Sequence, residues 1–124
     1  MCIEMIIDEN YYRVWLSVLP VPQTTTVAET VLRLTTRRPE LGSWDWIIDI
    51  RAPHEKATLD EVDHIATAFN AARSKQSYTI FITDDPLAPE RCAFMDTKFV
   101  HRRNMFARTP AGAVSLLPKS VRIF

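Results

Sequence analysis

The sequence predicts one α/β domain spanning residues 1–124, with helices packed on a mixed, mostly parallel sheet of four to five strands. Three observations predict it. Segments rich in β-branched and aromatic residues alternate with segments of helical periodicity, in the order ββαβαβαβα. Two Thr-x-x-Glu motifs mark helix starts. The central segment, residues 44–50, is apolar on both faces, as in a strand buried between two layers.

The chain opens with a predicted β-hairpin. Residues 2–7 and 11–19 read as extended segments, joined by an Asp-Glu-Asn turn. In the second segment Val14, Leu16 and Val18 share one face, which is the period of a strand. The prolines that follow cannot donate to a sheet and so end this strand.

The first predicted helix and the central strand come next. Thr26 and Glu29 form a capping box, in which the hydroxyl accepts a backbone N–H and the carboxylate reaches back. The helix ends before Pro39. Residues 44–50 then form the buried strand, and its Asp49 must find hydrogen-bond donors or acquire a raised pKa.

The second half of the chain alternates helix and strand. A second capping box, Thr58 with Glu61, starts a helix within residues 58–75 whose apolar side chains form one stripe. Strands separated by helices need crossover connections, so these later strands are expected to be parallel. The remaining predicted elements are a strand at 77–83, a helix at 89–102, a strand at 104–108 and a helix at 110–117.

Composition limits the function. The formal net charge is zero, which disfavours nucleic acid as a partner, and no apolar run reaches the ~20 residues of a membrane span. The acidic N-terminus and two cysteines without a disulfide pattern predict a cytoplasmic protein with reduced thiols. Two glycines cannot build a phosphate-binding loop, and the three histidines lack metal-ligand spacing, so we expect neither cofactor nor metal.

The loops after the predicted parallel strands form a candidate ligand or partner site. In open parallel sheets, ligands bind beyond the carboxyl ends of the strands. Acid–base chemistry is one interpretation of this set, and ordinary loop polarity with turn capping by an Asp before Pro86 is the other. The candidate residues are Arg51, His54, Glu55, Thr58, Asp84 and Asp85.

A second candidate site is a basic patch near the C-terminus. Basic residues interleaved with phenylalanines can grip phosphates, although cations also collect at the end of a helix because of its dipole. With zero net charge, an acidic or phosphorylated partner is favoured over nucleic acid. The patch residues are Lys98, His101, Arg102, Arg103 and Arg108.

Two segments carry a family resemblance. "WIIDIRA", with Asp49 near the end of its strand, and "NMFARTPAGAVSLL", a strand running into a capped helix, resemble the STAS family, the anti-sigma-factor antagonist and sulfate-transporter domains. The chain is also similar to small bacterial relatives grouped with lipid-binding SEC14-like domains. Signalling STAS domains carry a phosphorylated Ser in a turn where this chain reads "APHEKATLDE", so the phosphoryl switch is not expected here.

These observations predict a non-catalytic regulatory or protein-interaction module of STAS-like type, whose open sheet edge is compatible with a homodimer. One alternative is a small-molecule or lipid-binding module with a cleft between helices and sheet, which a cavity lined by residues such as Trp15, Trp46, Phe81 and Phe94 would favour. The other is a small enzyme that uses the loop residues at the strand ends.

Overall fold

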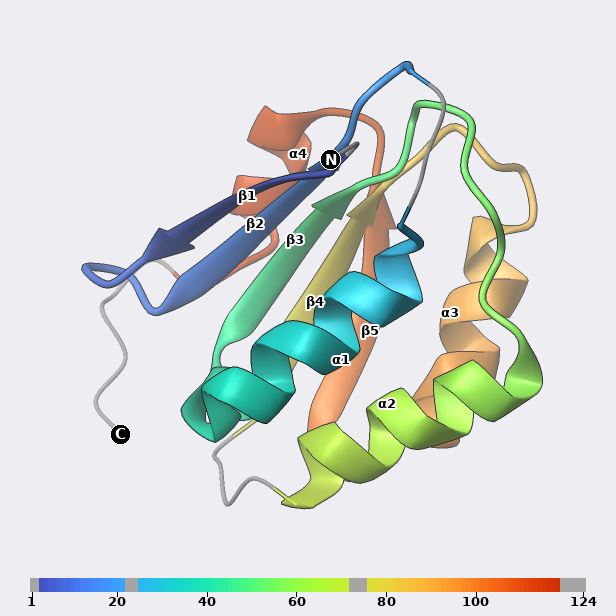
Figure 1. Ribbon diagram of the computed structural model, residues 1–124. Coiled ribbons are helices and arrows are strands. Elements are labelled where there is room, and N and C mark those ends of the chain that lie inside the picture. The colour runs from blue at the N-terminus through green and yellow to red at the C-terminus, as the bar shows by residue number, and fades with distance from the viewer. Residues whose placement is uncertain (1–2, 22–24, 72–75, 119–124) are drawn as a thin grey trace.

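A computed structural model describes residues 3–21, 25–71 and 76–118, and shows an α/β fold with a five-stranded mixed sheet (Figure 1). This confirms the predicted class of fold. Along the chain the elements are β1 (Ile3–Asp8), β2 (Arg13–Val18), α1 (Val27–Arg37), the 3-10 helix η1 (Pro39–Ser43), β3 (Asp45–Asp49), α2 (Leu59–Ala71), β4 (Ser77–Ile82), α3 (Ala88–Asp96), β5 (Arg102–Ala107) and α4 (Pro110–Ser115).

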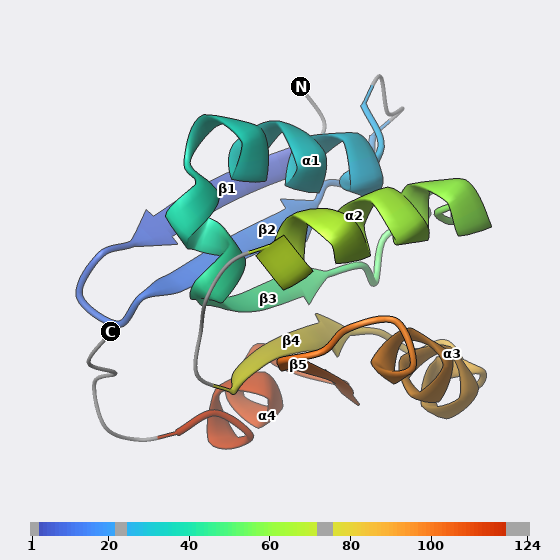
Figure 2. The same ribbon diagram turned by 90° about the horizontal axis from the view of Figure 1, so that it is seen from below.

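The strands lie in the sheet in the same order as in the chain, β1-β2-β3-β4-β5. β1 and β2 are antiparallel, and β2 through β5 are parallel to one another. Each crossover connection therefore leads to the neighbouring strand on the same side. Because such connections are right-handed, their helices lie on one face of the sheet. Figure 2 shows α1 and α2 over that face and α4 on the opposite side.

The sheet separates two apolar cores. The larger lies under α1 and α2, and it contains alternate residues of the central strands such as Leu16, Trp46 and Ile48. The smaller lies under α4, where Ile47 and Ile80 pack with the residues around Ala113. β3 is therefore buried on both faces, as its sequence predicts, because successive side chains of a strand point to opposite sides.

Of the two predicted capping boxes, the second is confirmed in full and the first in its hydroxyl half. The Thr26 hydroxyl accepts from the backbone N–H of Glu29 at 3.1 Å. The second box is reciprocal: the backbone N–H of Glu61 donates to the Thr58 hydroxyl at 3.2 Å, and the backbone N–H of Thr58 donates to the Glu61 carboxylate at 3.0 Å. Each cap satisfies backbone donors that the first turn of a helix leaves without a partner.

The predicted third helix is too long. It ends at Asp96 rather than near residue 102, and β5 begins at Arg102 rather than at Asn104. The side chain of Asn70, near the end of α2, accounts for the turn between them. Its amide donates to the Lys98 carbonyl at 3.0 Å and its oxygen accepts from the Val100 N–H at 2.9 Å, so those backbone groups bond outside any helix. The helix predicted at 58–75 is described from Leu59 to Ala71, and residues 72–75 lie outside the described residues.

Candidate functional site

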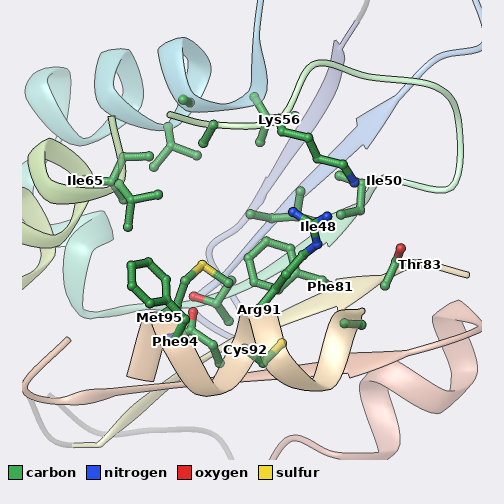
Figure 3. A pocket seen from close by; sticks show the side chains of 18 of the residues that line it. Ile48, Ile50, Lys56, Ile65, Phe81, Thr83, Arg91, Cys92, Phe94 and Met95 are labelled. Carbon is green, nitrogen blue, oxygen red and sulfur yellow. The ribbon is translucent and has the colours of Figure 1, made fainter. Parts of the chain in front are cut away.

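A cavity of about 440 Å³ lies on the face of the sheet that carries α1, α2 and α3 (Figure 3). Most of its lining is aliphatic or aromatic, and polar groups gather at one side. Natural pockets for small molecules have this size and this composition, mostly apolar with few polar groups. The lining comes from the helices α1, α2 and α3, the segments that connect them to the sheet, and the strands β3, β4 and β5.

The floor of the cavity is formed by alternate residues of neighbouring strands. Ile48 of β3 lies beside Phe81 of β4 in the parallel register, and both side chains point toward the helices. Thr79 and Thr83, two residues before and after Phe81, lie on the same face, as the period of a strand requires. Thr79 has its hydroxyl hydrogen-bonded to Arg102 at 3.0 Å, so this polar group is satisfied within the protein.

The helical walls are apolar side chains that are only partly buried. α1 contributes Val27 and α2 contributes Val62 and Ile65, while Met95 reaches in from α3. In a fully packed helix–sheet interface such residues would be buried, because interiors are close-packed. Their partial exposure shows that the helices and the sheet are separated at this point.

The inner end of the cavity is closed by an aromatic cluster. The rings of Trp46 and Phe69 meet edge-on with centroids 5.4 Å apart, and Phe69 lies 5.8 Å from Phe99. All three line the cavity. Asn70 fixes α2 to the turn after α3 at this same end, through its two hydrogen bonds to Lys98 and Val100.

The rim of the cavity carries an ionic cluster, defined here as Lys56, Asp85 and Arg91. The ammonium of Lys56 contacts Oδ2 of Asp85 at 3.3 Å, and Nε of Arg91 contacts the same oxygen at 2.9 Å. Oδ1 of Asp85 accepts from the backbone N–H of Leu87 at 2.9 Å, the turn cap expected before Pro86. The Leu87 N–H, followed by Lys56 and Arg91, lowers the pKa of Asp85, so this carboxyl is ionised at neutral pH.

The other predicted loop residues separate into distinct roles. Arg51 clasps Asp49 at the end of β3, with Nε to Oδ1 at 3.0 Å and Nη2 to Oδ2 at 2.7 Å. These bonds lower the pKa of Asp49. They supply the hydrogen-bond donors that the sequence predicts for this carboxylate. Asp84 is exposed beside this pair, where its charge adds to the effect of Asp49 in raising the pKa of Arg51. Thr58 serves as the helix cap.

His54 and Glu55 lie in the cavity wall with the ionic cluster, whereas Arg51, Thr58 and Asp84 are outside it. Nδ1 of His54 is 3.2 Å from the carbonyl oxygen of Ala52, which fixes the ring against its own loop. The structure therefore brings together His54, Glu55 and Asp85 of the predicted set, and it places the rest of that set elsewhere.

The predicted basic patch is wrong in one member, Arg102, which is buried. Arg102 is only 5% exposed, and its guanidinium hydrogen-bonds inside the protein. Lys98 pairs with Asp63 of α2 at 3.2 Å. His101, Arg103 and Arg108 are exposed. The patch as predicted comprises Lys98, His101, Arg102, Arg103 and Arg108.

Cys92 also lines the cavity, from α3. Burial, with a contribution from the charge of Asp96, raises the pKa of its thiol to about 11. A thiol of that pKa is protonated at neutral pH and is a poor nucleophile or metal ligand. Within residues 3–21, 25–71 and 76–118, no three His, Cys, Asp or Glu side chains gather as metal ligands would. Over the same ranges, no helix is both long and apolar enough to cross a membrane.

The sequence indicated part of this site. Trp46, Phe81 and Phe94 line the cavity as the cleft hypothesis expected, but Trp15 lies on the other face of the sheet, against the smaller core. Arg91 was not among the predicted site residues. The sequence feature that indicates Arg91 is its position in the first turn of the helix after the Asp84–Asp85 loop, within reach of those carboxylates.

Known proteins supply no assignment for the cavity. No family model, no curated protein and no solved structure matches the chain. The resemblance to STAS domains therefore stays a prediction.

Proposed function

We propose that the protein is a binding module for an apolar or amphipathic small molecule, held between α1, α2 and α3 and the sheet. The observation that supports this proposal is the apolar cavity of about 440 Å³. It is the feature that distinguishes a ligand-binding module from a fully packed interaction domain.

The energetics of the cavity favour an apolar occupant. Cavities lined by side chains such as Ile48, Ile65 and Phe81 bind apolar molecules and hold water poorly, because water finds few hydrogen-bond partners there. Each methylene group moved from water into such a site gains about 0.8 kcal/mol. A chain of several carbons would therefore bind with useful affinity from this term alone.

The polar groups of the site favour binding over catalysis. Asp85 is held by a backbone N–H and two cations, and the Cys92 thiol is protonated at neutral pH. The Asp85 carboxylate is thus engaged by three donors, and a protonated thiol is a poor nucleophile, so neither group is free to act on a substrate. We therefore prefer a binding role to the enzyme alternative.

Trp46 gives a direct test, because it lines the cavity. A brominated fatty acid such as bromododecanoate should quench its fluorescence saturably, since bromine quenches an indole that it contacts. Replacing Trp46 with Phe should remove most of that quenching, because Trp15 lies on the other face of the sheet and Trp44, although it belongs to the larger core, does not line the cavity. The absence of saturable quenching would contradict the proposal.

A matched pair of variants tests the location. Val62→Phe places a ring in the cavity and displaces two or three methylene groups of a bound chain, so the Kd should rise about 10-fold or more. Val114→Phe makes the same change on α4, across the sheet, and should leave the Kd unchanged. Equal effects of the two variants would show that the ligand binds elsewhere.

The second candidate is the protein-interaction module of STAS-like type. Its support is β1, an edge strand on which Ile6 is 64% exposed. Edge strands can pair with another chain, including a second copy, and exposed apolar side chains strengthen such contacts. Light scattering of the purified protein, compared with an Ile6→Lys variant, would reveal self-association through this edge.

A further inference from the structure

The ionic cluster at the rim has an unusual geometry for a surface ion pair. Two cations, Lys56 from the loop after β3 and Arg91 from α3, share one carboxylate oxygen of Asp85. Figure 3 shows the nitrogen-bearing ends of Lys56 and Arg91 directed toward each other across the cavity, on the side of Ile50. The contact with the Asp85 carboxylate shows that this pair of cations can bind an oxyanion.

The two cations keep further donors. The Asp85 side chain is 18% exposed, whereas those of Lys56 and Arg91 are 52% and 46% exposed. Within the described part of the chain, the two Nη groups of Arg91 have no hydrogen-bond acceptor. A guanidinium presents five donors and an ammonium three, so a second oxyanion can be bound beside Asp85 or in its place.

We propose that the ligand is a single-chain amphiphile with an oxyanion head, its head bound by Lys56 and Arg91 and its chain running toward Phe69 and Phe99. This inference rests on the proposed function and adds the chemical class of the ligand. Such a ligand would contact both ends of the cavity, because the cations lie at the rim and the aromatic cluster closes the opposite end.

The volume of the cavity limits the length of chain that can be buried, since the cavity is open at its mouth. At about 30 Å³ for a group of the size of water, a cavity of about 440 Å³ holds about 15 such groups. With incomplete filling, this corresponds to an acyl chain of about 10–14 carbons. Affinity should rise about 4-fold per methylene up to that length, and then level off as further carbons extend past the mouth.

The charges around the mouth limit the strength of head recognition. Glu55 and Glu90 also line the cavity, but both are exposed to solvent, where water and salt weaken their repulsion of an anion. Lys56 and Arg91 are half-exposed as well. We therefore expect the anionic head to improve affinity about 3- to 5-fold, the size of a partly exposed ion pair.

Calorimetric titration with three probes of one chain length tests the class of ligand. Dodecanoate and dodecyl phosphate, used below their micelle concentrations, should both bind more tightly than dodecanol, and their ratio distinguishes a carboxylate head from a phosphate head. Equal affinity for all three would overturn the head-group inference while leaving the proposed function intact. Binding of none of them would overturn both.

Variants of the ionic cluster give the sharper test. Lys56→Met and Arg91→Met should each remove most of the preference for dodecanoate over dodecanol. Asp85→Asn should instead raise dodecanoate affinity about 3- to 5-fold, because it frees both cations while its amide oxygen still accepts from the Leu87 N–H. Arg103→Met, on the exposed side of β5, is the matched control. Unchanged or weaker dodecanoate binding by a folded Asp85→Asn protein would contradict the inference.

Discussion

Arg102 is the side chain whose loss should destabilise the protein most clearly. It is buried at the start of β5, and its guanidinium lies 4.3 Å from the centre of the Phe69 ring. The guanidinium ties β4 and β5 to the end of η1 and the start of β3. Its acceptors are the backbone carbonyls of Gly42, Trp44 and Tyr78 and the hydroxyl of Thr79.

The size of the effect of Arg102→Met follows from these contacts. Methionine keeps the aliphatic packing but removes every donor, and the carbonyl oxygens remain in place. Replacing both partners of a buried ion pair with apolar groups can leave stability unchanged. Most acceptors of Arg102 are backbone carbonyls, which a substitution cannot remove. Each buried acceptor left without a donor costs about 1–3 kcal/mol, and partial relaxation brings the total to about 3–5 kcal/mol.

Urea unfolding followed by tryptophan fluorescence and by circular dichroism measures this loss. The protein should remain folded without urea, since a chain of 124 residues has a stability of about 6–18 kcal/mol. With a slope of about 2 kcal/mol per molar urea, the midpoint should fall by about 2 M. Arg103→Met, the same change one residue along β5 at an exposed position, should stay within about 0.5 kcal/mol of wild type. Equal midpoints for the two variants would refute the role of Arg102.

Two further predictions concern titrating groups. Because Arg51 lowers the pKa of Asp49, this pair stabilises the folded protein above about pH 4 and loses its effect as the pH falls through the lowered pKa. Arg51→Met should therefore lower the Tm at pH 7 and show a smaller decline of Tm on acidification; parallel Tm–pH curves would contradict this. In a Cys2→Ser background, Cys92 should react with iodoacetamide at pH 8 about 100-fold more slowly than an ordinary thiol, because its pKa is about 11. A rate equal to that of free cysteine would exclude the raised pKa.

The parts of the fold that could be predicted are those in which local sequence and burial agree. β3 reads as a strand buried on both faces because Trp46, Ile47 and Ile48 are apolar whichever face they take, and helices cover both faces. The capping boxes were legible because their partners are three residues apart, so no tertiary information is needed. The extra length given to α3 shows the limit: the turn that replaces its last residues is bonded to Asn70, 28 residues before Lys98.

The prediction that Arg102 lies on the surface was wrong for the same reason. A run of basic residues is usually solvated, and nothing local indicates that one of them meets the carbonyls of Gly42 and Trp44, about 60 positions earlier in the chain. Its burial follows from strand parity only once the register of β5 against β4 is known. Long-range hydrogen bonds of this kind have no periodicity to detect.

The cavity is the extreme case, because it depends on a distance between helices that no pattern encodes. The apolar stripe of α2 predicts that Val62 and Ile65 face the sheet, and the alternation in β4 predicts that Phe81 faces the helices. Neither predicts whether these side chains touch. Long-range contacts lie at the two ends of the cavity: Asn70 bonds α2 to the turn after α3 at the aromatic end, and Asp85 pairs with Lys56 and Arg91 at the rim. Loss of the Asn70 bonds should therefore alter the affinity for the proposed ligand while leaving the apolar wall of the cavity in place.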